Sequence, residues 1–396
     1  MTDASTARNA TGPRDALTDV TGLRVGHAQL TGERALSGTT AILTEPGGAV
    51  AAVDVRGGGP GTKETDALDP RNLVQRVEAV VLTGGSAFGL DSASGVMAWL
   101  EEAGRGVRVG PDPSQVVPVV PAAAVFDLGR GGDWRARPDA ALGRLAAEAA
   151  ARTEAGAPVA QGNVGAGTGA VAGGLKGGVG TASTVLPSGV TVAALAVVNA
   201  AGSVVDPDTG VLYGADRRAS LPPEERHRAA VSALAEAREE SGRRAASSAR
   251  PPLNTTIAVV ATDAALTRAQ AQKLAGTAHD GLARAVRPVH LLTDGDTVFV
   301  LATGTHPLPA EDGLPAGVDY ALGAVNGILA AGADVLQRAV VKGVLAAEGV
   351  DGPGGVFPSY RDLYGDVSGD PVGPEGPVGP EGPGGPGDSG VSAEAR

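Results

Sequence analysis

The chain has 396 residues, a formal net charge of −12 and no cysteine. The lack of cysteine excludes disulfides, a thiol nucleophile and a cysteine-based zinc site, and the acidic balance without a lysine/arginine cluster argues against a nucleic-acid partner. No segment has the apolar length of a membrane span or of a secretion signal, so we expect a cytoplasmic protein with no membrane partner. Because only 3% of the residues are aromatic and 61 are glycine, the core is predicted to consist of small aliphatic side chains in close contact.

The first half of the chain alternates apolar runs with glycine-rich turns. Residues 1–16 lack apolar periodicity and are predicted to be disordered. Residues 77–85 form an apolar run typical of a buried strand, after which Ser86 is placed to cap a helix that continues through 91–102. A second buried strand is predicted over residues 190–200.

The second half continues this alternation of strands and helices. Residues 256–263 predict a third buried strand, and Thr267 opens a capping box whose helix runs toward Pro288. A short turn, a strand over 297–303 and a long helix over 318–348 follow. Strands and helices in this mixture indicate an α+β or α/β fold in which helices cover buried sheets.

Two segments differ from this pattern. Residues 216–252 mix charges with helix breakers and contain a short helical patch at 229–240, so we expect a flexible segment. Residues 366–396 form a Gly/Pro-rich tail that is predicted to be disordered and PPII-like. Unstructured loops of this length inside a domain are usually functional, disordered or cut, so the first segment is a candidate cleavage region.

Asn254, Thr255 and Thr256 follow that segment and immediately precede the third buried strand. A threonine hydroxyl is a weak nucleophile unless a base lies beside it, and the α-amine of an N-terminal threonine, with a reference pKa of about 7.7–8.0, is the simplest such base. Cleavage of the Asn254–Thr255 bond would create that terminus. On this stretch alone, the commoner interpretation is a turn that leads into a strand.

Several longer motifs follow one another along the chain: LTDVTGLRVGHA (17–28), VDVRGGGPGTKETDALDP (53–70), VVLTGGSAFGLDSASGV (80–96), GNVGAGTGAVAGGLKGGVGTAS (162–183), VVNAAG (197–202) and NTTIAVVATDA (254–264). In this order they resemble the DmpA-like family of N-terminal-nucleophile hydrolases, peptidase family S58. The Asn-Thr junction is most similar to that of the 6-aminohexanoate-oligomer endo-hydrolases. The resemblance implies a four-layer α/β/β/α sandwich of the DmpA/ornithine acetyltransferase type, usually as a homotetramer without a cofactor. One domain would form from two autocleaved chains, about 1–254 and 255–396, through their fragments 17–254 and 255–365.

The resemblance also implies roles for individual residues. Thr255 would attack the carbonyl of Asn254 during self-cleavage and substrate amides afterwards. Lys176 would be the active-site lysine, and Asn199 would stabilise the oxyanion. Asp294 and Asp296 match a carboxylate pair that holds the Thr255 amine or Lys176 in place.

Each of these residues also has an ordinary structural interpretation. Lys176 suits a surface glycine loop, Asn199 a turn after a strand, and the aspartate pair a hairpin turn or a cation site. No further acidic ligand follows the aspartates at EF-hand spacing, so a metal site is rejected. The choice of Lys176 or the Thr255 amine as the general base stays open.

Ser86, Phe126 and Trp134 are further candidates for binding substrate, although a core position is the commoner role for the two aromatic residues. The leading hypothesis is a self-processing amidohydrolase that acts on linear amides, such as 6-aminohexanoate oligomers or peptides. The alternatives are an aminopeptidase/amidase for D- or β-amino-acid N-termini, an acyltransferase similar to the ornithine acetyltransferases, and a non-enzymatic binding protein.

Overall fold

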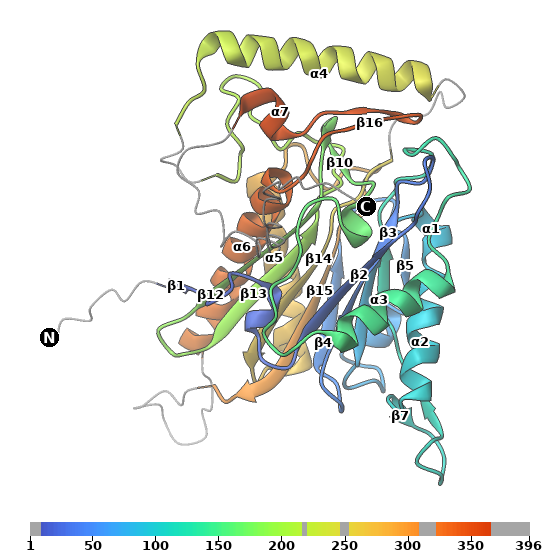
Figure 1. The fold of residues 1–396 in the computed structure, drawn as a ribbon. Helices are drawn as coiled ribbons and strands as arrows, with labels where there is room; N and C mark the ends of the chain where they lie inside the picture. Colours follow the sequence, from blue (N-terminus) through green and yellow to red (C-terminus); the bar gives the residue numbers. More distant parts are fainter. Residues whose placement is uncertain (1–8, 216–219, 246–252, 309–321, 366–396) are drawn as a thin grey trace, which may run out of the picture.

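The computed structural model describes residues 9–215, 220–245, 253–308 and 322–365, and two β-sheets form its centre (Figure 1). The larger sheet has six strands in the order β1-β12-β13-β14-β15-β4. β14 and β15 are parallel, and the other neighbouring pairs are antiparallel. Its strands are β1 (Ala10–Thr11), β12 (Val179–Val185), β13 (Thr191–Val197), β14 (Ile257–Ala264), β15 (Thr297–His306) and β4 (Val50–Val55).

The second sheet has five strands in the order β2-β3-β6-β9-β5. They are β2 (Arg24–Gln29), β3 (Gly38–Leu43), β6 (Ala79–Thr83), β9 (Ala122–Ala124) and β5 (Thr62–Lys63). Three two-stranded pairs lie outside the sheets: β7 (Val107–Arg108) with β8 (Val116–Val117), β10 (Val171–Ala172) with β11 (Leu175–Lys176), and β16 (Val350–Gly352) with β17 (Gly355–Phe357).

Helices cover the outer face of each sheet, so the molecule has four layers (Figure 1). α5 (Arg268–Ala285) and α6 (Leu322–Leu345) pack on the larger sheet, whereas α2 (Ser92–Glu102) and α3 (Ala140–Arg152) pack on the smaller one. The remaining helices are α1 (Ser86–Gly89), α4 (Glu224–Arg244), α7 (Tyr360–Tyr364) and the short 3-10 turns η1 (Leu17–Asp19), η2 (Asp66–Leu68) and η3 (Gly165–Gly167). This arrangement confirms the predicted α/β/β/α sandwich.

Three apolar clusters fill the spaces between the layers. The middle cluster lies between the sheets and includes Ile42, Leu82, Leu195, Val259 and Phe299. All eight residues of β14 are buried, because one face of the strand meets the second sheet and the other meets the helices. A strand buried on both faces reads as a continuous apolar run rather than as an alternating one.

Local sequence signals explain the ends of the helix that follows β14. α5 begins after Thr267, whose side chain accepts a hydrogen bond from the Gln270 amide in the predicted capping box. The prediction that Ser86 caps a helix is wrong. Gly85, with φ of +78°, is the N-cap of α1, and Asp91 is the N-cap of α2.

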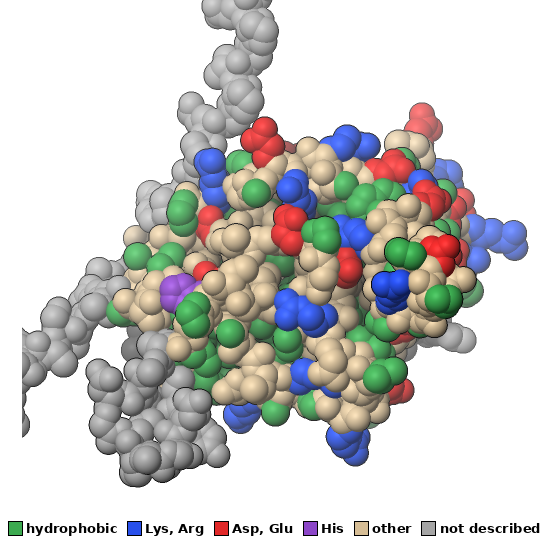
Figure 2. Space-filling model, turned by 90° about the horizontal axis from the view of Figure 1, so that it is seen from below, with side chains coloured by type: hydrophobic (Ala, Val, Ile, Leu, Met, Phe, Trp, Pro, Cys, Tyr) green, Lys and Arg blue, Asp and Glu red, His purple; other side chains and the backbone are tan. Residues whose placement is uncertain are grey.

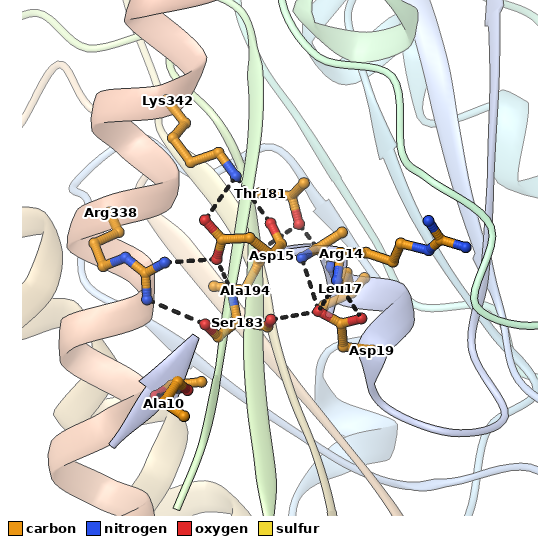
Figure 3. A network of polar contacts seen from close by, with 12 residues as sticks. Ala10, Arg14, Asp15, Leu17, Asp19, Thr181, Ser183, Ala194, Arg338 and Lys342 are labelled. Atoms are coloured by element: carbon orange, nitrogen blue, oxygen red, sulfur yellow. Dashed lines mark hydrogen bonds and ion pairs between the residues drawn. The ribbon is translucent and has the colours of Figure 1, made fainter. Parts of the chain in front are cut away.

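The predicted disorder of residues 1–16 is wrong for residues 9–16. β1 adds to the edge of the larger sheet by pairing with β12, and Asp15 forms ion pairs with Arg338 and Lys342 of α6 (Figure 3). Asp19 accepts a hydrogen bond from Ser183 Oγ at 2.5 Å. Long-range partners, which periodicity does not reveal, hold this segment in place.

The segment over 216–252 also contains more structure than predicted. α4 spans 21 residues and lies across one end of the molecule above α7 and β16 (Figure 1). Its charged residues include several i,i+3 and i,i+4 pairs, such as Arg244 with Glu240, and these pairs support a helix with few buried positions. Residues 246–252 and the predicted disordered tail over 366–396 lie outside the described residues.

Acidic, basic and apolar side chains intermingle on the face seen from below, without a broad field of one charge (Figure 2). Among the helices of the described residues, none combines the length and hydropathy that a bilayer crossing requires.

Candidate active site

The larger sheet brings the predicted polar residues to one edge. Val197 at the end of β13 is opposite Ile257 at the start of β14, and Ile257 is opposite Thr297 at the start of β15. Val179 at the start of β12 is also opposite Val197. The residues just outside these strand ends therefore converge: Lys176, Asn199, Asn254, Thr255, Asp294 and Asp296.

Thr255 lies at the centre of this edge with 4% of its surface exposed. Its amide donates a 2.6 Å hydrogen bond to the carbonyl of Asn199. Its hydroxyl donates to the carbonyl oxygen of Asn254 at 2.6 Å, across a peptide bond that is continuous in this structure. The hydroxyl is therefore adjacent to the carbonyl that self-cleavage would attack.

Gly295 makes room for that hydroxyl. A Cβ atom at this position would lie 2.8 Å from Thr255 Oγ1 and 2.8 Å from the carbonyl oxygen of Gly59. A side chain at Gly295 would therefore displace the nucleophile or the glycine-rich loop that follows β4.

Lys176 ends β11 and is completely buried. Its Nζ donates to the carbonyl oxygens of Gly167, Ala170 and Gly177 at 2.9, 3.0 and 2.6 Å. Burial, together with the charge of Arg130, lowers the pKa of Lys176 to about 7. The amine therefore changes protonation near neutral pH. Among the described residues, its hydrogen bonds go to these carbonyls and none goes to Thr255.

The two aspartates organise the loops around the nucleophile. Asp296 accepts hydrogen bonds from the Thr256 amide at 2.8 Å and from His290, through its amide at 3.1 Å and Nδ1 at 2.8 Å. Asp294 accepts from the amides of Ala201 at 3.3 Å and Leu291 at 3.0 Å. Burial, and then the charge of Asp296, raises the pKa of Asp294. Both carboxylates thus bind backbone amides near Thr255 rather than Lys176.

Arg130 reaches the site from the turn that follows β9 of the second sheet, and sequence reasoning missed it. Its Nη1 donates to Gly169 O at 2.7 Å and also to Asn199 Oδ1, while its Nη2 donates to Asn254 Oδ1 at 2.6 Å. Its place in the glycine-rich stretch LGRGGD is typical of an exposed loop. Only the packing of the two sheets brings this arginine to the Asn254–Thr255 bond.

The side-chain amide of Asn199 is engaged at both ends. Its Oδ1 accepts from Arg130 and from the Val171 amide at 3.0 Å, and its Nδ2 donates to Phe126 O at 3.4 Å. The last distance is long for a hydrogen bond. Nδ2 is thus the less firmly bound end of the amide, and it is the end that can donate to an oxyanion.

Asp127 is the second charged residue that the sequence did not reveal. It is 2% exposed, and its Oδ1 accepts from the Gly85 amide at 2.7 Å. Burial raises its pKa, whereas the charge of Arg130 opposes that rise. The carboxylate also favours the charged form of Lys176. A buried acid therefore lies among the cations of the site, where it offsets part of their charge.

The predicted substrate-binding residues lie on the side of the second sheet. Ser86 follows β6, with φ of +53°, and its amide donates to Val125 O at 2.9 Å. Phe126 is half-buried, and its ring meets Trp134 edge-on at 6.3 Å between centroids. Trp134 is 50% exposed, so it does not belong to the core. Among the described residues, no group of three or more His, Asp or Glu side chains has a metal-binding arrangement.

Comparison with solved structures identifies the class of fold. The L-aminopeptidase D-Ala-esterase/amidase of Ochrobactrum anthropi, whose structure is described as a variant of the Ntn hydrolase fold, aligns with a TM-score of 0.65 at 22% identity. That alignment covers 91% of this chain and 97% of the other. A Burkholderia sp. beta-aminopeptidase aligns with a TM-score of 0.63 at 24% identity, over 92% of this chain and 97% of the other. The fold is that of the Ntn hydrolases.

The sequence comparison identifies the family. The profile of peptidase family S58 matches residues 15–357, so the chain belongs to that family and is a hydrolase of amide bonds. An uncharacterized aminopeptidase of Mycobacterium tuberculosis is 50% identical over 360 residues, covering 88% of this chain and 98% of the relative. A 6-aminohexanoate-oligomer endohydrolase of Kocuria sp. is 29% identical over 314 residues, covering 77% and 79% respectively.

Proposed function

We propose that the protein is a self-processing N-terminal-threonine amidohydrolase that cleaves linear amides through an acyl-enzyme on Thr255. The observation that carries this proposal is the 2.6 Å contact between the Thr255 hydroxyl and the carbonyl oxygen of Asn254. The nucleophile is buried two residues before the central strand β14, so the sheet holds its position firmly. Membership of a peptidase family supplies the reaction class.

In the first step, Thr255 Oγ attacks the carbonyl carbon of Asn254. The C–N bond breaks, the hydroxyl proton passes to the departing nitrogen, and an ester joins Asn254 to Thr255 Oγ. The departing nitrogen is now the α-amine of Thr255, and water then hydrolyses the ester to leave an Asn254 carboxylate and a free hydroxyl. The same hydroxyl next attacks a substrate amide, releases the amine product and passes the acyl group to water.

The groups around Thr255 support this chemistry. Asn199 Nδ2 is the proposed donor to the oxyanion, and Arg130 holds the other end of that amide. Lys176, with its pKa lowered to about 7, and the new α-amine are the two candidate bases. The amine does not exist before cleavage, so we assign Lys176 to the processing step.

The proposed substrates are linear oligoamides and peptides. Relatives named 6-aminohexanoate-oligomer endohydrolases favour internal cleavage of oligomers. The higher identity to chains named aminopeptidases favours removal of N-terminal residues. A substrate screen therefore includes both oligoamides and peptides with free N-termini.

The test is the denatured intact mass of the purified protein together with the N-terminal sequence of each chain. We expect two chains whose masses sum to the 38.8 kDa chain plus one water, the smaller one beginning Thr-Thr-Ile-Ala. Thr255→Ala is expected to stay uncut and inactive, and Thr255→Ser to be cut. Thr256→Val is the matched control, because the Thr256 hydroxyl lacks a hydrogen-bond partner among the described residues. An active Thr255→Ala protein, or a cut at another bond, would refute the mechanism.

A further inference from the structure

The uncut chain shows how an acyl group lies in its own active site. The same Thr255 hydroxyl attacks first the Asn254 carbonyl and later the substrate carbonyl. The two carbonyls must therefore occupy the same place, within the short range that attack requires. Whatever now surrounds Asn254 will surround the acyl residue of a substrate.

Two contacts hold Asn254 besides the bond to Thr255. Its side-chain oxygen accepts a 2.6 Å hydrogen bond from Arg130 Nη2, and its amide donates to the Thr293 carbonyl at 3.2 Å. Only 6% of its surface is exposed. Both the side chain and the backbone nitrogen of this acyl residue are therefore recognised in a water-poor setting.

Arg130 is fixed independently of Asn254. Its Nη1 is bound to Gly169 O and to Asn199 Oδ1, both of which remain after cleavage. When Asn254 leaves the site, Nη2 loses this acceptor while the guanidinium stays in place. A half-buried cationic donor without an acceptor is unfavourable, so a substrate that supplies an oxygen at this point gains from the contact.

We propose that Arg130 is the acyl-side specificity residue, and that it selects substrates whose acyl residue carries a side-chain oxygen at the asparagine position, namely amides of L-asparagine and L-aspartate. This inference rests on the proposed function and names its substrate class. The Thr293 carbonyl is placed to accept from the nitrogen of that residue, which in a short substrate is the free α-amine.

Maturation itself provides the first test, because the residue at 254 is the acyl group of the processing reaction. Variants are made by cell-free synthesis, and the cut fraction is followed during a chase. Asn254→Leu and Arg130→Gln are each expected to mature about 10- to 100-fold more slowly, as loss of one charge-assisted hydrogen bond implies. Asn254→Asp, which keeps the oxygen, is expected to mature within a few-fold of wild type.

The double variant separates this contact from the other role of Arg130 at Asn199. If Nη2 acts through Asn254, Asn254→Leu/Arg130→Gln will mature no more slowly than Arg130→Gln alone. Fully additive losses would show that the pair does not act as a unit and would overturn the proposal. Arg135→Gln is the matched control, an exposed arginine of the same loop whose replacement is expected to leave maturation unchanged.

Mature wild-type enzyme provides the second test, with the p-nitroanilides of L-asparagine, L-aspartate (α-linked), L-alanine and L-leucine. We expect kcat/KM for the first two to exceed that for L-leucine by at least about 10-fold, and the surviving mature fraction of Arg130→Lys to lose most of that ratio. Equal values for the four substrates, or wild-type maturation of Asn254→Leu, would overturn the proposal. A wild-type chain that is never cut after Asn254 would instead refute the proposed function.

Discussion

At the residue scale, Lys176 lies in surroundings very different from those of an exposed lysine. It is fully buried and its ammonium form has three carbonyl acceptors. Burial nevertheless dominates and lowers its pKa from 10.5 to about 7. The carbonyls hold the amine in place, while the water-poor surroundings disfavour its charged form and bring its pKa close to neutral pH. These properties suit a group that exchanges protons at neutral pH.

This lowered pKa predicts a pH dependence of stability. Because the folded pKa lies below the unfolded one, the unfolded chain binds the extra proton between about pH 7 and 10.5, so the free energy of unfolding rises with pH across that window and is flat below it. In the uncut Thr255→Ala protein, urea unfolding is expected to show a rise between pH 7 and 9 that is larger by about 2 kcal/mol than in Thr255→Ala/Lys176→Met. If the free energy of unfolding changes equally with pH in the two proteins, the pKa of Lys176 is not lowered in the folded state.

Site residues could be predicted where a motif or a strand end marks them. Thr255, Asn199 and the aspartates lie beside apolar runs that identify strands, and strand pairing places them together. Arg130, Asp127 and His290 could not be found in this way. Their roles depend on how the second sheet and the turn before β15 pack against the site residues of the larger sheet. No local sequence pattern encodes those contacts.

At the element scale, the loop after β4 shows why the sequence has successive glycines there. The amides of Gly57 and Gly59 donate to Asp296 O at 3.3 Å and Asp294 O at 2.7 Å. A Cβ atom at Gly57 would lie 2.3 Å from the Asp296 nitrogen, which is backbone and cannot turn aside. The backbone of the loop thus packs directly on the backbone of the Asp294–Asp296 turn and holds that turn against β14.

This contact predicts different effects for two neighbouring substitutions. Gly57→Ala is expected to cost about 1–3 kcal/mol of stability through overpacking and to slow maturation, because it displaces the turn that binds the Thr256 amide. Gly59→Ala is the matched control, since its Cβ would meet atoms no nearer than 3.4 Å. Thermal unfolding and the cut fraction measure both effects. Equal behaviour of the two variants would show that the turn tolerates displacement.

Periodicity predicted the central strands and the long helices well, because burial on both faces or on one stripe leaves a direct pattern in the sequence. It identified only residues 229–240 of α4 and none of the structure of residues 9–16. Two residues of α4 are buried in the structure, so its apolar face is too narrow for periodicity to mark the full length of the helix. The N-terminal segment depends on ion pairs between Asp15 and residues more than 300 positions away.

At the scale of the whole molecule, the proposed cut falls inside the larger sheet rather than between domains. β4, β12 and β13 would belong to the first chain, and β14 and β15 to the second. β14 pairs with β13 over six residues, and β15 pairs with β4 over six residues on its other edge. The inter-sheet core likewise contains residues from both sides of the cut, including Leu82 and Val259.

Cleavage is therefore expected to leave one folded body. Native size-exclusion chromatography should give the cut enzyme and the uncut Thr255→Ala protein the same elution volume, whereas denaturing electrophoresis should resolve two chains from the former and one from the latter. The physical reason is that separation would break the pairing of β13 with β14. The facing edge of each strand, and the apolar faces on either side of the pair, would then be exposed to water. If the cut protein elutes as two species under native conditions, the two chains do not share a core and the register of the larger sheet is wrong.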